Sequence, residues 1–282
     1  MPASPPRVLF AGLVDDAALF PPGNAPMPEA LAAHARHRGA SYGDLVGPFV
    51  CPASRVEELL GALPGDQRVE LSLVFDVTGD GAHRALRAAG GDDRVSLVSL
   101  EAAHARLGDD ATVIGENLRR LPAVVGFLEV PRTGFEASLA LVADGGWQAA
   151  KYRTGGTSPD AFPTEAELAA FLAACAERGL PFKLTAGLHH AVRHTDPRTG
   201  FEHPGVLNVL VATASARRGA PVGELAAVLA ERRPEPLVAA VRGWTEADCL
   251  DVRRSLRSFG CCGVTDPIDD LATLGLVEEV AR

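Results

Sequence analysis

The sequence contains 282 residues, of which 47% are hydrophobic and 22% are charged, and its formal net charge is −9. This size and composition are typical of a globular protein with a substantial core, and they fit a single large domain. The negative charge argues against a nucleic-acid-binding protein, because such proteins need a basic surface to contact the phosphate backbone.

Short apolar runs alternate with helical windows along the chain. The predicted strands are 8–14, 46–51, 69–76, 95–100, 124–130, 148–153, 181–185 and 258–262. The predicted helices include 28–38, 54–63, 81–89, 135–143, 165–178 and 204–218, with two more between 221 and 257. Such alternation indicates parallel strands joined by crossover helices. Eight strands in this length predict a single (β/α)8 TIM-type barrel domain over residues 1–282, with an open doubly wound sheet as the alternative.

Two helix starts are marked by their capping residues. Thr164 and Glu167 form the spacing of a capping box, and Thr245 with Asp248 offers a second one. These pairs predict helices that begin at residues 165 and 246.

Cysteine usage and the lack of targeting signals bear on location. The five cysteines are odd in number and form no CxxC pair, which argues against a disulfide framework and favours a reducing cytoplasm. The N-terminus has no signal-peptide pattern, and no run approaches 18 apolar residues. We therefore expect a cytoplasmic protein without membrane contacts, either a monomer or a homo-oligomer.

Lysine is the rarest basic residue in the chain, with only Lys151 and Lys183 against 25 arginines. Both lie in predicted strands that run into glycine turns. Unlike arginine, lysine can lose its charge in a suitable environment and attack a carbonyl group. Because side chains alternate along a strand, Lys151 and Arg153 share one face and Tyr152 lies on the other. This pattern predicts that both lysines face the interior of the barrel.

The charge state of Lys151 depends on its neighbours. Lysines on adjacent strands would repel each other, and repulsion together with burial lowers the pKa of an amine. We therefore expect Lys183 to depress the pKa of Lys151. Glu129 on the preceding strand could instead pair with Lys151 and hold it charged, and the sequence leaves both outcomes open.

The segments Lys151-Tyr-Arg-Thr-Gly-Gly156 and Lys183-Leu-Thr-Ala-Gly187 resemble strands six and seven of the class I aldolases of the deoxyribose-phosphate aldolase type. The resemblance implies that Lys151 is the Schiff-base lysine and that Lys183 lowers its pKa. It also implies an acidic proton-relay residue on strand four, for which Glu101 is the candidate. Arg153 departs from the small residue of that family, and His189 and His190 depart from its short basic turn. The chain also resembles uncharacterised bacterial proteins that share the Arg-Thr-Gly-Gly and Gly-Leu-His-His segments.

Other polar residues follow the predicted strands at the end where barrels carry their active sites. Asp15 and Asp16 after strand one are a candidate substrate-facing acid pair. Residues 153–156 offer a guanidinium and backbone N–H groups that could cradle a phosphate or carboxylate. These substrate-binding candidates are Arg153, Thr154, Gly155, Gly156, Asp15 and Asp16.

Four of the eight histidines lie between residues 189 and 203, in a connection long enough to form a lid. His189 and His190 are candidates for moving protons near Lys151. Together with Glu129 they could instead bind a metal ion, although their spacing matches no standard zinc motif. Cys261 has no evident base and is expected to be a buried structural residue.

The residues favour a lyase of the aldolase type that needs no cofactor. Its catalytic residues would be Lys151, Lys183, His189, His190 and Glu129, and its substrate a small carbonyl compound, anionic or phosphorylated. The first alternative is a metal-dependent hydrolase, isomerase or lyase that uses the histidines and Glu129 as ligands. The second is a barrel that binds a small anion without catalysis.

Overall fold

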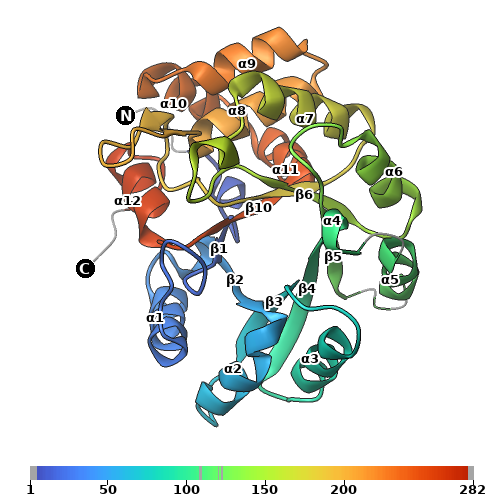
Figure 1. Cartoon of the computed structure of the whole chain (residues 1–282). Coiled ribbons are helices and arrows are strands. Elements are labelled where there is room, and N and C mark those ends of the chain that lie inside the picture. Colours follow the sequence, from blue (N-terminus) through green and yellow to red (C-terminus); the bar gives the residue numbers. More distant parts are fainter. Residues whose placement is uncertain (1–4, 108–109, 120, 122, 279–282) are drawn as a thin grey trace.

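Eight parallel strands close into a barrel at the centre of the computed structural model (Figure 1). The structure describes residues 5–278 apart from 108, 109, 120 and 122. The strand order around the barrel is β1-β10-β7-β6-β5-β4-β3-β2, which confirms the TIM-type barrel and excludes the open sheet. The barrel strands are β1 (Val14–Asp16), β2 (Val46–Pro52), β3 (Val69–Phe75), β4 (Val95–Ala103), β5 (Val125–Glu129), β6 (Ala149–Arg153), β7 (Phe182–Thr185) and β10 (Leu256–Cys261).

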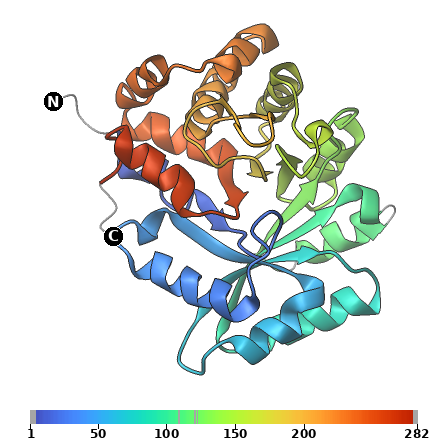
Figure 2. The ribbon, with the colours of Figure 1, turned by 60° about the vertical axis from the view of Figure 1, so that its left-hand side comes forward.

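Helices surround the strands on the outside. Figure 2 shows α1 to α3 on one side of the barrel and α7 to α10 on the opposite side. The helices are α1 (Met27–Gly39), α2 (Val56–Ala62), α3 (Asp80–Gly90), α4 (His104–Leu107), α5 (Asp110–Leu118), α6 (Glu136–Asp144), α7 (Glu165–Glu177), α8 (Val206–Arg217), α9 (Val222–Ala230), α10 (Pro234–Arg242), α11 (Glu246–Ser255) and α12 (Thr265–Thr273). None of the helices in the described ranges is both long and apolar enough to cross a membrane.

Both capping boxes are confirmed. The side chain of Thr164 accepts a hydrogen bond from the backbone N–H of Glu167, whose carboxylate accepts one in return. Thr245 and Asp248 make the same pair of contacts at the start of α11. Each box satisfies backbone groups that a helix start leaves without partners.

Two predictions about elements are wrong. Residues 8–13 are not a strand: Arg7–Leu9 is a 3-10 helix, and the chain turns at Gly12, which has a φ of 55°. Leu9 and Phe10 are buried there, so their apolar character reflects packing under the barrel rather than a strand. The stretch 221–257 holds three helices instead of two, because α9 ends at Ala230 and Pro234, at the first position of a helix, begins a separate α10.

The outward faces of the strands pack on the helices. Tyr152 is fully buried and stacks on Phe171 of α7, with ring centroids 4.3 Å apart. Phe182 of β7 meets the same ring edge-on at 5.4 Å. This packing confirms that Tyr152 points outward, and it follows from strand alternation that Lys151 and Arg153 point to the barrel interior.

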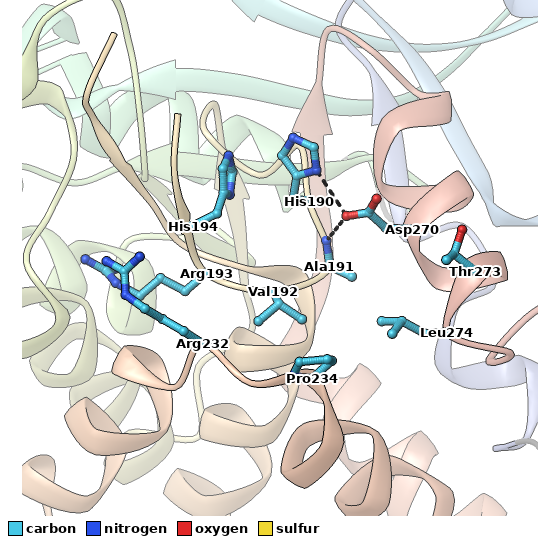
Figure 3. Close-up of a pocket in the computed structure, with 10 residues that line it drawn as sticks. All are labelled: His190, Ala191, Val192, Arg193, His194, Arg232, Pro234, Asp270, Thr273 and Leu274. Carbon is cyan, nitrogen blue, oxygen red and sulfur yellow. Dashed lines mark hydrogen bonds and ion pairs between the residues drawn. The ribbon is translucent and has the colours of Figure 1, made fainter. Parts of the chain in front are cut away.

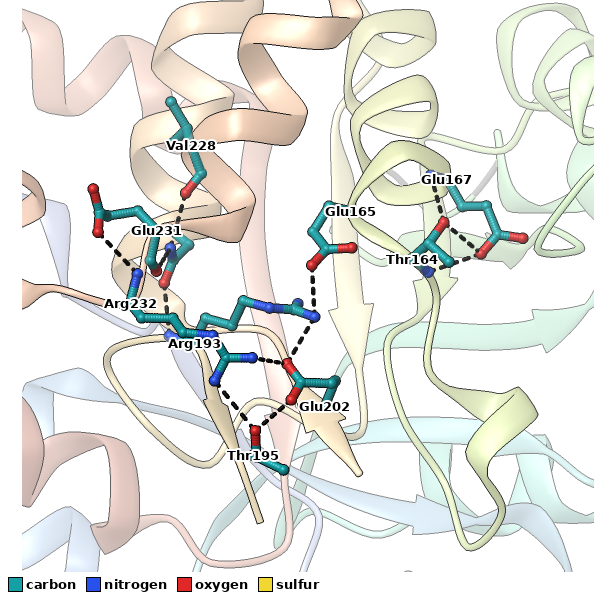
Figure 4. Close-up of polar contacts among 10 residues, drawn as sticks. Thr164, Glu165, Glu167, Arg193, Thr195, Glu202, Val228, Glu231 and Arg232 are labelled. Carbon is teal, nitrogen blue, oxygen red and sulfur yellow. Dashed lines mark hydrogen bonds and ion pairs between the residues drawn. The ribbon is translucent and has the colours of Figure 1, made fainter. Parts of the chain in front are cut away.

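The connection from β7 to α8 is an ordered structure of its own. It contains a small antiparallel pair, β8 (His194–Thr195) and β9 (Glu202–His203). Arg193 is buried between Glu165 at the start of α7 and Glu202 of β9, at 2.7 and 3.0 Å (Figure 4). Its backbone N–H donates to Asn208 of α8. These contacts fasten the connection to the outer helices beside the barrel.

Candidate active site

A buried charged cluster occupies the barrel interior near the carboxyl ends of the strands. Lys151 of β6 and Lys183 of β7 are direct partners in the parallel register. Glu101 of β4 contacts both amines: Oε2 lies 2.8 Å from Nζ of Lys151, and Oε1 lies 2.6 Å from Nζ of Lys183. Because β4, β6 and β7 are separate strands, their side chains can meet only across the inside of the barrel.

Two further carboxylates complete the ion pairs of the lysines. Glu129 of β5 lies 3.0 Å from Nζ of Lys151 and 3.3 Å from Nε of Arg153. Asp15 of β1 lies 2.6 Å from Nζ of Lys183. The cluster therefore joins three acidic and three basic side chains, and its charges balance when all are ionised.

Serine hydroxyls and a glycine support the carboxylates from neighbouring strands. Ser72 of β3 donates to Oε1 of Glu101 at 2.5 Å, and Ser258 of β10 donates to Oδ2 of Asp15 at 2.7 Å. Gly47 of β2 leaves room for Asp15, since a Cβ at this position would lie only 2.2 Å from Oδ1. That buried Oδ1 has no hydrogen-bond donor among the described residues.

The carboxylates hold both lysines in the charged form. Burial alone would lower the pKa of Lys151, but Glu101 and Glu129 outweigh it and raise the pKa above its ordinary value. The pKa of Lys183 is raised in the same way, against burial, by Asp15 and Glu101. Lys183 acts to lower the pKa of Lys151, as expected, but this repulsion is smaller than the attraction of the carboxylates. The expected net decrease in the pKa of Lys151 is therefore wrong, and the alternative in which Glu129 holds Lys151 charged is the one observed.

The pKa values of the three acids shift in different directions. Burial opposes ionisation of Glu101, but the two ammonium groups lower its pKa well below the usual range. Burial likewise opposes ionisation of Glu129, and Lys151 and Arg153 lower its pKa. For Asp15 burial is the larger effect and raises the pKa, although Lys183 acts against it. Glu101 and Glu129 are therefore the carboxylates that stay ionised and keep Lys151 charged.

Exposure increases from the cluster toward the mouth of the barrel. The side chain of Lys151 is 6% exposed, that of Glu129 18%, and that of Arg153 50%. The residues that follow on the inner faces of β1, β7 and β10 are small. A Cβ at Gly260 would have only Thr185 and Ala17 as neighbours, at 3.5 and 3.8 Å. Of these three side chains, Arg153 is therefore the most accessible to solvent and Lys151 the least.

The remaining substrate-binding candidates lie apart from the cluster. Asp16 points away from Asp15 and accepts hydrogen bonds from the backbone N–H of Ala18 and from His34 of α1, the latter at 3.0 Å. In β1 the two aspartates alternate in direction, so they cannot form one acid pair. Asp16 is a structural contact between the strand and α1.

The turn after β6 is a packing element. Thr154 is fully buried and donates to the carbonyl oxygens of Thr185 and Ala186. A Cβ at Gly155 would lie 2.6 Å from Cα of Gly187, so the two turns touch backbone to backbone. A Cβ at Gly156 would lie equally close to Cβ of Ala161, at 2.6 Å. These contacts explain the two glycines without a ligand.

The two candidate histidines pair with α12. Nδ1 of His189 lies 2.8 Å from Asp266, and Nδ1 of His190 lies 3.0 Å from Asp270, one helical turn further on. Neither histidine contacts a lysine of the cluster in the described structure. His190 also lines a pocket of about 460 Å³, whose lining includes Arg232 and Leu274 (Figure 3). In the part of the chain that the structure describes, the recorded carboxylate partners of His189 and His190 thus lie on α12 and not in the interior cluster.

The described part of the chain brings no three His, Cys, Asp or Glu side chains into an arrangement that could hold a metal ion. In the metal-dependent alternative the ligands would be His189, His190 and Glu129. The two histidines contact Asp266 and Asp270 of α12, whereas Glu129 contacts Lys151 in the barrel interior. The residues that connect the cluster and that sequence reasoning missed are Ser72, Ser99 and Ser258. Their signal was a hydroxyl within a predicted strand.

Comparison with protein-family models, with curated proteins and with solved structures finds no match to this chain. The resemblance to class I aldolases in strands six and seven therefore stays a prediction.

Proposed function

We propose that the chain is an aldolase-like lyase that acts on a small carbonyl compound, with Lys151 as the amine that forms an imine with the substrate. The observation that supports this most strongly is the carboxylate of Glu101, which contacts the amines of Lys151 and Lys183 together. A proton that leaves Lys151 has an acceptor within hydrogen-bond distance in Glu129, the more exposed of its two carboxylate partners, at 3.0 Å.

Formation of the free amine is the costly step. A lysine of ordinary pKa is uncharged in about one molecule in 3,000 at pH 7, which corresponds to about 5 kcal/mol, and the raised pKa of Lys151 makes this fraction smaller. The attack therefore has to be coupled to transfer of the ammonium proton to a carboxylate when the substrate arrives. A carbonyl compound that displaces water from Glu129 would favour this transfer, because the neutral amine and the protonated acid are less penalised in a dry site.

The same carboxylates favour the product of the attack. The carbonyl oxygen leaves as water, and the imine formed on Lys151 carries one positive charge when protonated. Glu101 and Glu129 stabilise this charge as they stabilise the resting ammonium group. A protonated imine withdraws electrons from the adjacent carbon–carbon bond, which is the property that an aldol cleavage needs.

Lys183 and Arg153 have separate roles in this proposal. Lys183 stays charged between Asp15 and Glu101 and holds Glu101 in its ionised form. Arg153 lies at the mouth on the same face as Lys151, and its guanidinium suits a carboxylate or phosphate group of the substrate.

A second candidate is an enzyme that uses the same cluster without a covalent intermediate. The raised pKa values of both lysines favour it directly, because charged ammonium groups stabilise an enolate that develops next to a carbonyl group. Glu129, the most exposed acid of the cluster, would then remove the proton from carbon. This candidate predicts proton exchange at carbon and no adduct on Lys151.

Reduction with borohydride in the presence of small aldehydes and ketones distinguishes the two candidates. Besides the α-amino group, Lys151 and Lys183 are the only primary amines in the chain, so peptide mass mapping can assign any adduct without ambiguity. We expect one adduct, on Lys151. Lys151→Arg keeps the charge between Glu101 and Glu129 and should abolish it, whereas the matched variant Lys183→Arg should retain labelling at Lys151.

A parallel measurement follows carbon-bound hydrogen exchange of the same compounds in heavy water by nuclear magnetic resonance. Exchange without an adduct would support the enolate candidate and remove the imine. An adduct spread over both lysines in proportion to their exposure would also contradict the proposal. Binding of the compounds with neither exchange nor adduct would leave a barrel that holds small anions without catalysis.

A further inference from the structure

A second group of reactive side chains lies between the β7–α8 connection and the segment after β10. Nε2 of His189 lies 3.5 Å from Sγ of Cys262, and Nδ1 of the same ring lies 2.8 Å from Oδ2 of Asp266. The three side chains thus form a thiol, an imidazole and a carboxylate in series. This order matches that of a nucleophile, its general base and the group that orients the base.

The carboxylate determines which ring nitrogen can accept a proton. Nδ1 of His189 donates to Asp266, so in the neutral ring Nε2 has the free lone pair and faces Cys262. The pKa of His189 is raised, chiefly by Asp266 and then by the thiols of Cys261 and Cys262. A proton that moves from the thiol of Cys262 to His189 is therefore stabilised where it arrives.

Of the two adjacent cysteines, Cys262 is the one suited to react. Cys261 is buried, donates its thiol to the carbonyl oxygen of Gly263 at 3.1 Å, and has a pKa raised by burial. Cys261 also lies 3.6 Å from Nδ1 of His189, the nitrogen that donates to Asp266, whereas Cys262 is partly exposed and faces Nε2. Cys261 is buried as the sequence predicts, but the expectation that no base lies near it is wrong, because His189 contacts its thiol.

The backbone around these residues is shaped to hold them. A Cβ at Gly263 would lie 2.3 Å from Oδ2 of Asp266, the oxygen that His189 contacts, so only glycine lets this carboxylate reach the ring. A Cβ at Gly23, in the loop after β1, would lie 3.0 Å from Cβ of Cys262. Both glycines leave space that the three side chains occupy, and all three follow barrel strands at their carboxyl ends, where barrel enzymes carry catalytic groups.

We propose that Cys262, His189 and Asp266 form a second catalytic centre, in which Cys262 accepts an acyl group from an activated ester or thioester. The thiol proton passes to Nε2 of His189 while sulfur forms a bond to the acyl carbon. The bond from that carbon to the oxygen or sulfur of the leaving group breaks, and His189 returns the proton to the leaving group. Water then gives a proton to His189 while its oxygen forms a bond to the acyl carbon. The bond from that carbon to the sulfur of Cys262 breaks, His189 returns the proton to the sulfur, and the acyl group leaves as a carboxylic acid.

The test uses p-nitrophenyl acetate with the unmodified full-length protein. We expect a burst of one nitrophenolate per chain, and peptide mapping after an acid quench should find the acetyl group on Cys262. The other cysteines of the chain serve as internal controls, because Cys51, Cys175 and Cys249 are buried and their pKa values are raised by burial. Acetylation spread over several cysteines, or confined to lysine and serine, would overturn the proposal.

Variants separate the role of the imidazole from simple exposure of a thiol. His189→Ala should slow acetylation of Cys262 by about 100-fold or more, the usual contribution of a positioned base. Cys262→Ser should remove the burst, whereas the matched variant Cys261→Ser should keep it. If His189→Ala folds and reacts at the rate of the unmodified protein, Cys262 is merely accessible and the proposal fails. The outcome does not depend on the lysine cluster, so it is independent of the borohydride experiment.

Discussion

Replacement of Glu101 by glutamine gives the sharpest test of how the lysine cluster is held together. Glutamine keeps the size of the side chain and removes only its charge. The carboxylate of Glu101 is 2% exposed and contacts the amines of Lys151 and Lys183 at 2.8 and 2.6 Å. Both amines are buried as well, so neither can turn to water when the charge is lost.

The expected loss of stability is large. Removal of one partner from a buried ion pair typically costs about 3–5 kcal/mol, because the other charge is left buried without compensation. Glu101 compensates two charges, but Glu129 and Asp15 remain beside Lys151 and Lys183, so we expect the loss to stay within this range. For a chain of this size about 1 kcal/mol lowers Tm by about 2–4 °C, which gives a decrease of roughly 6–20 °C.

The pH dependence of the same variant has a defined sign. The folded-state pKa of Glu101 lies below its ordinary value of 4.5, so its contribution to stability is present above pH 4.5 and is lost as the pH falls through the folded-state pKa. Glu101→Gln should therefore flatten the acid limb of the stability curve. The raised lysine pKa values act at the other end: their stabilisation is present below 10.5 and is lost as the pH rises through the folded-state values.

Urea unfolding of the unmodified protein and of Glu101→Gln between pH 3 and 7, followed by circular dichroism, measures the loss of stability and its dependence on acid pH. Glu58→Gln is the matched control, because Glu58 pairs with Arg55 at 2.8 Å but is half exposed, and its loss should cost less than about 1 kcal/mol. If Glu101→Gln and Glu58→Gln lose equal stability, or if the acid limb keeps its slope in Glu101→Gln, then an ionised Glu101 does not compensate the charges of Lys151 and Lys183.

Two local features give further predictions. Thr164→Ala removes the side chain that accepts from the backbone N–H of Glu167 and should lower the free energy of unfolding by about 1 kcal/mol in urea titrations, with labelling of Lys151 unchanged. Gly187→Ala should cost clearly more than Gly200→Ala. Both glycines have positive φ values, 79° and 72°, but a Cβ at Gly187 would lie 2.4 Å from the carbonyl oxygen of Thr154, whereas a Cβ at Gly200 meets nothing within 4 Å. We expect about 1 kcal/mol for Gly200→Ala from backbone strain alone, and equal losses in the two variants would refute the packing argument.

Some features of the protein depend on short-range patterns and could be predicted from the sequence. The alternation of apolar runs and helical windows predicts the barrel, since it determines how each segment buries its apolar face. The period of two along β6 places Lys151 and Arg153 inside and Tyr152 outside. The capping boxes at Thr164 and Thr245 are interactions over three residues and need no tertiary contact. By contrast, the apolar run 8–14 shows that composition alone does not distinguish a strand from a buried turn.

The charge state of the site could be determined only by the tertiary structure. Whether Lys151 is neutral or charged depends on which charges lie within a few ångströms, and Glu101, whose carboxylate decides it, is fifty residues earlier in the chain. The pairing of Cys262 with His189 spans 73 residues in the same way. Sequence determines the kinds of groups that are available and the face on which each lies. The closing of the barrel brings them to contact distance, and because Coulomb attraction and hydrogen bonding act only over short distances, that step decides their chemistry.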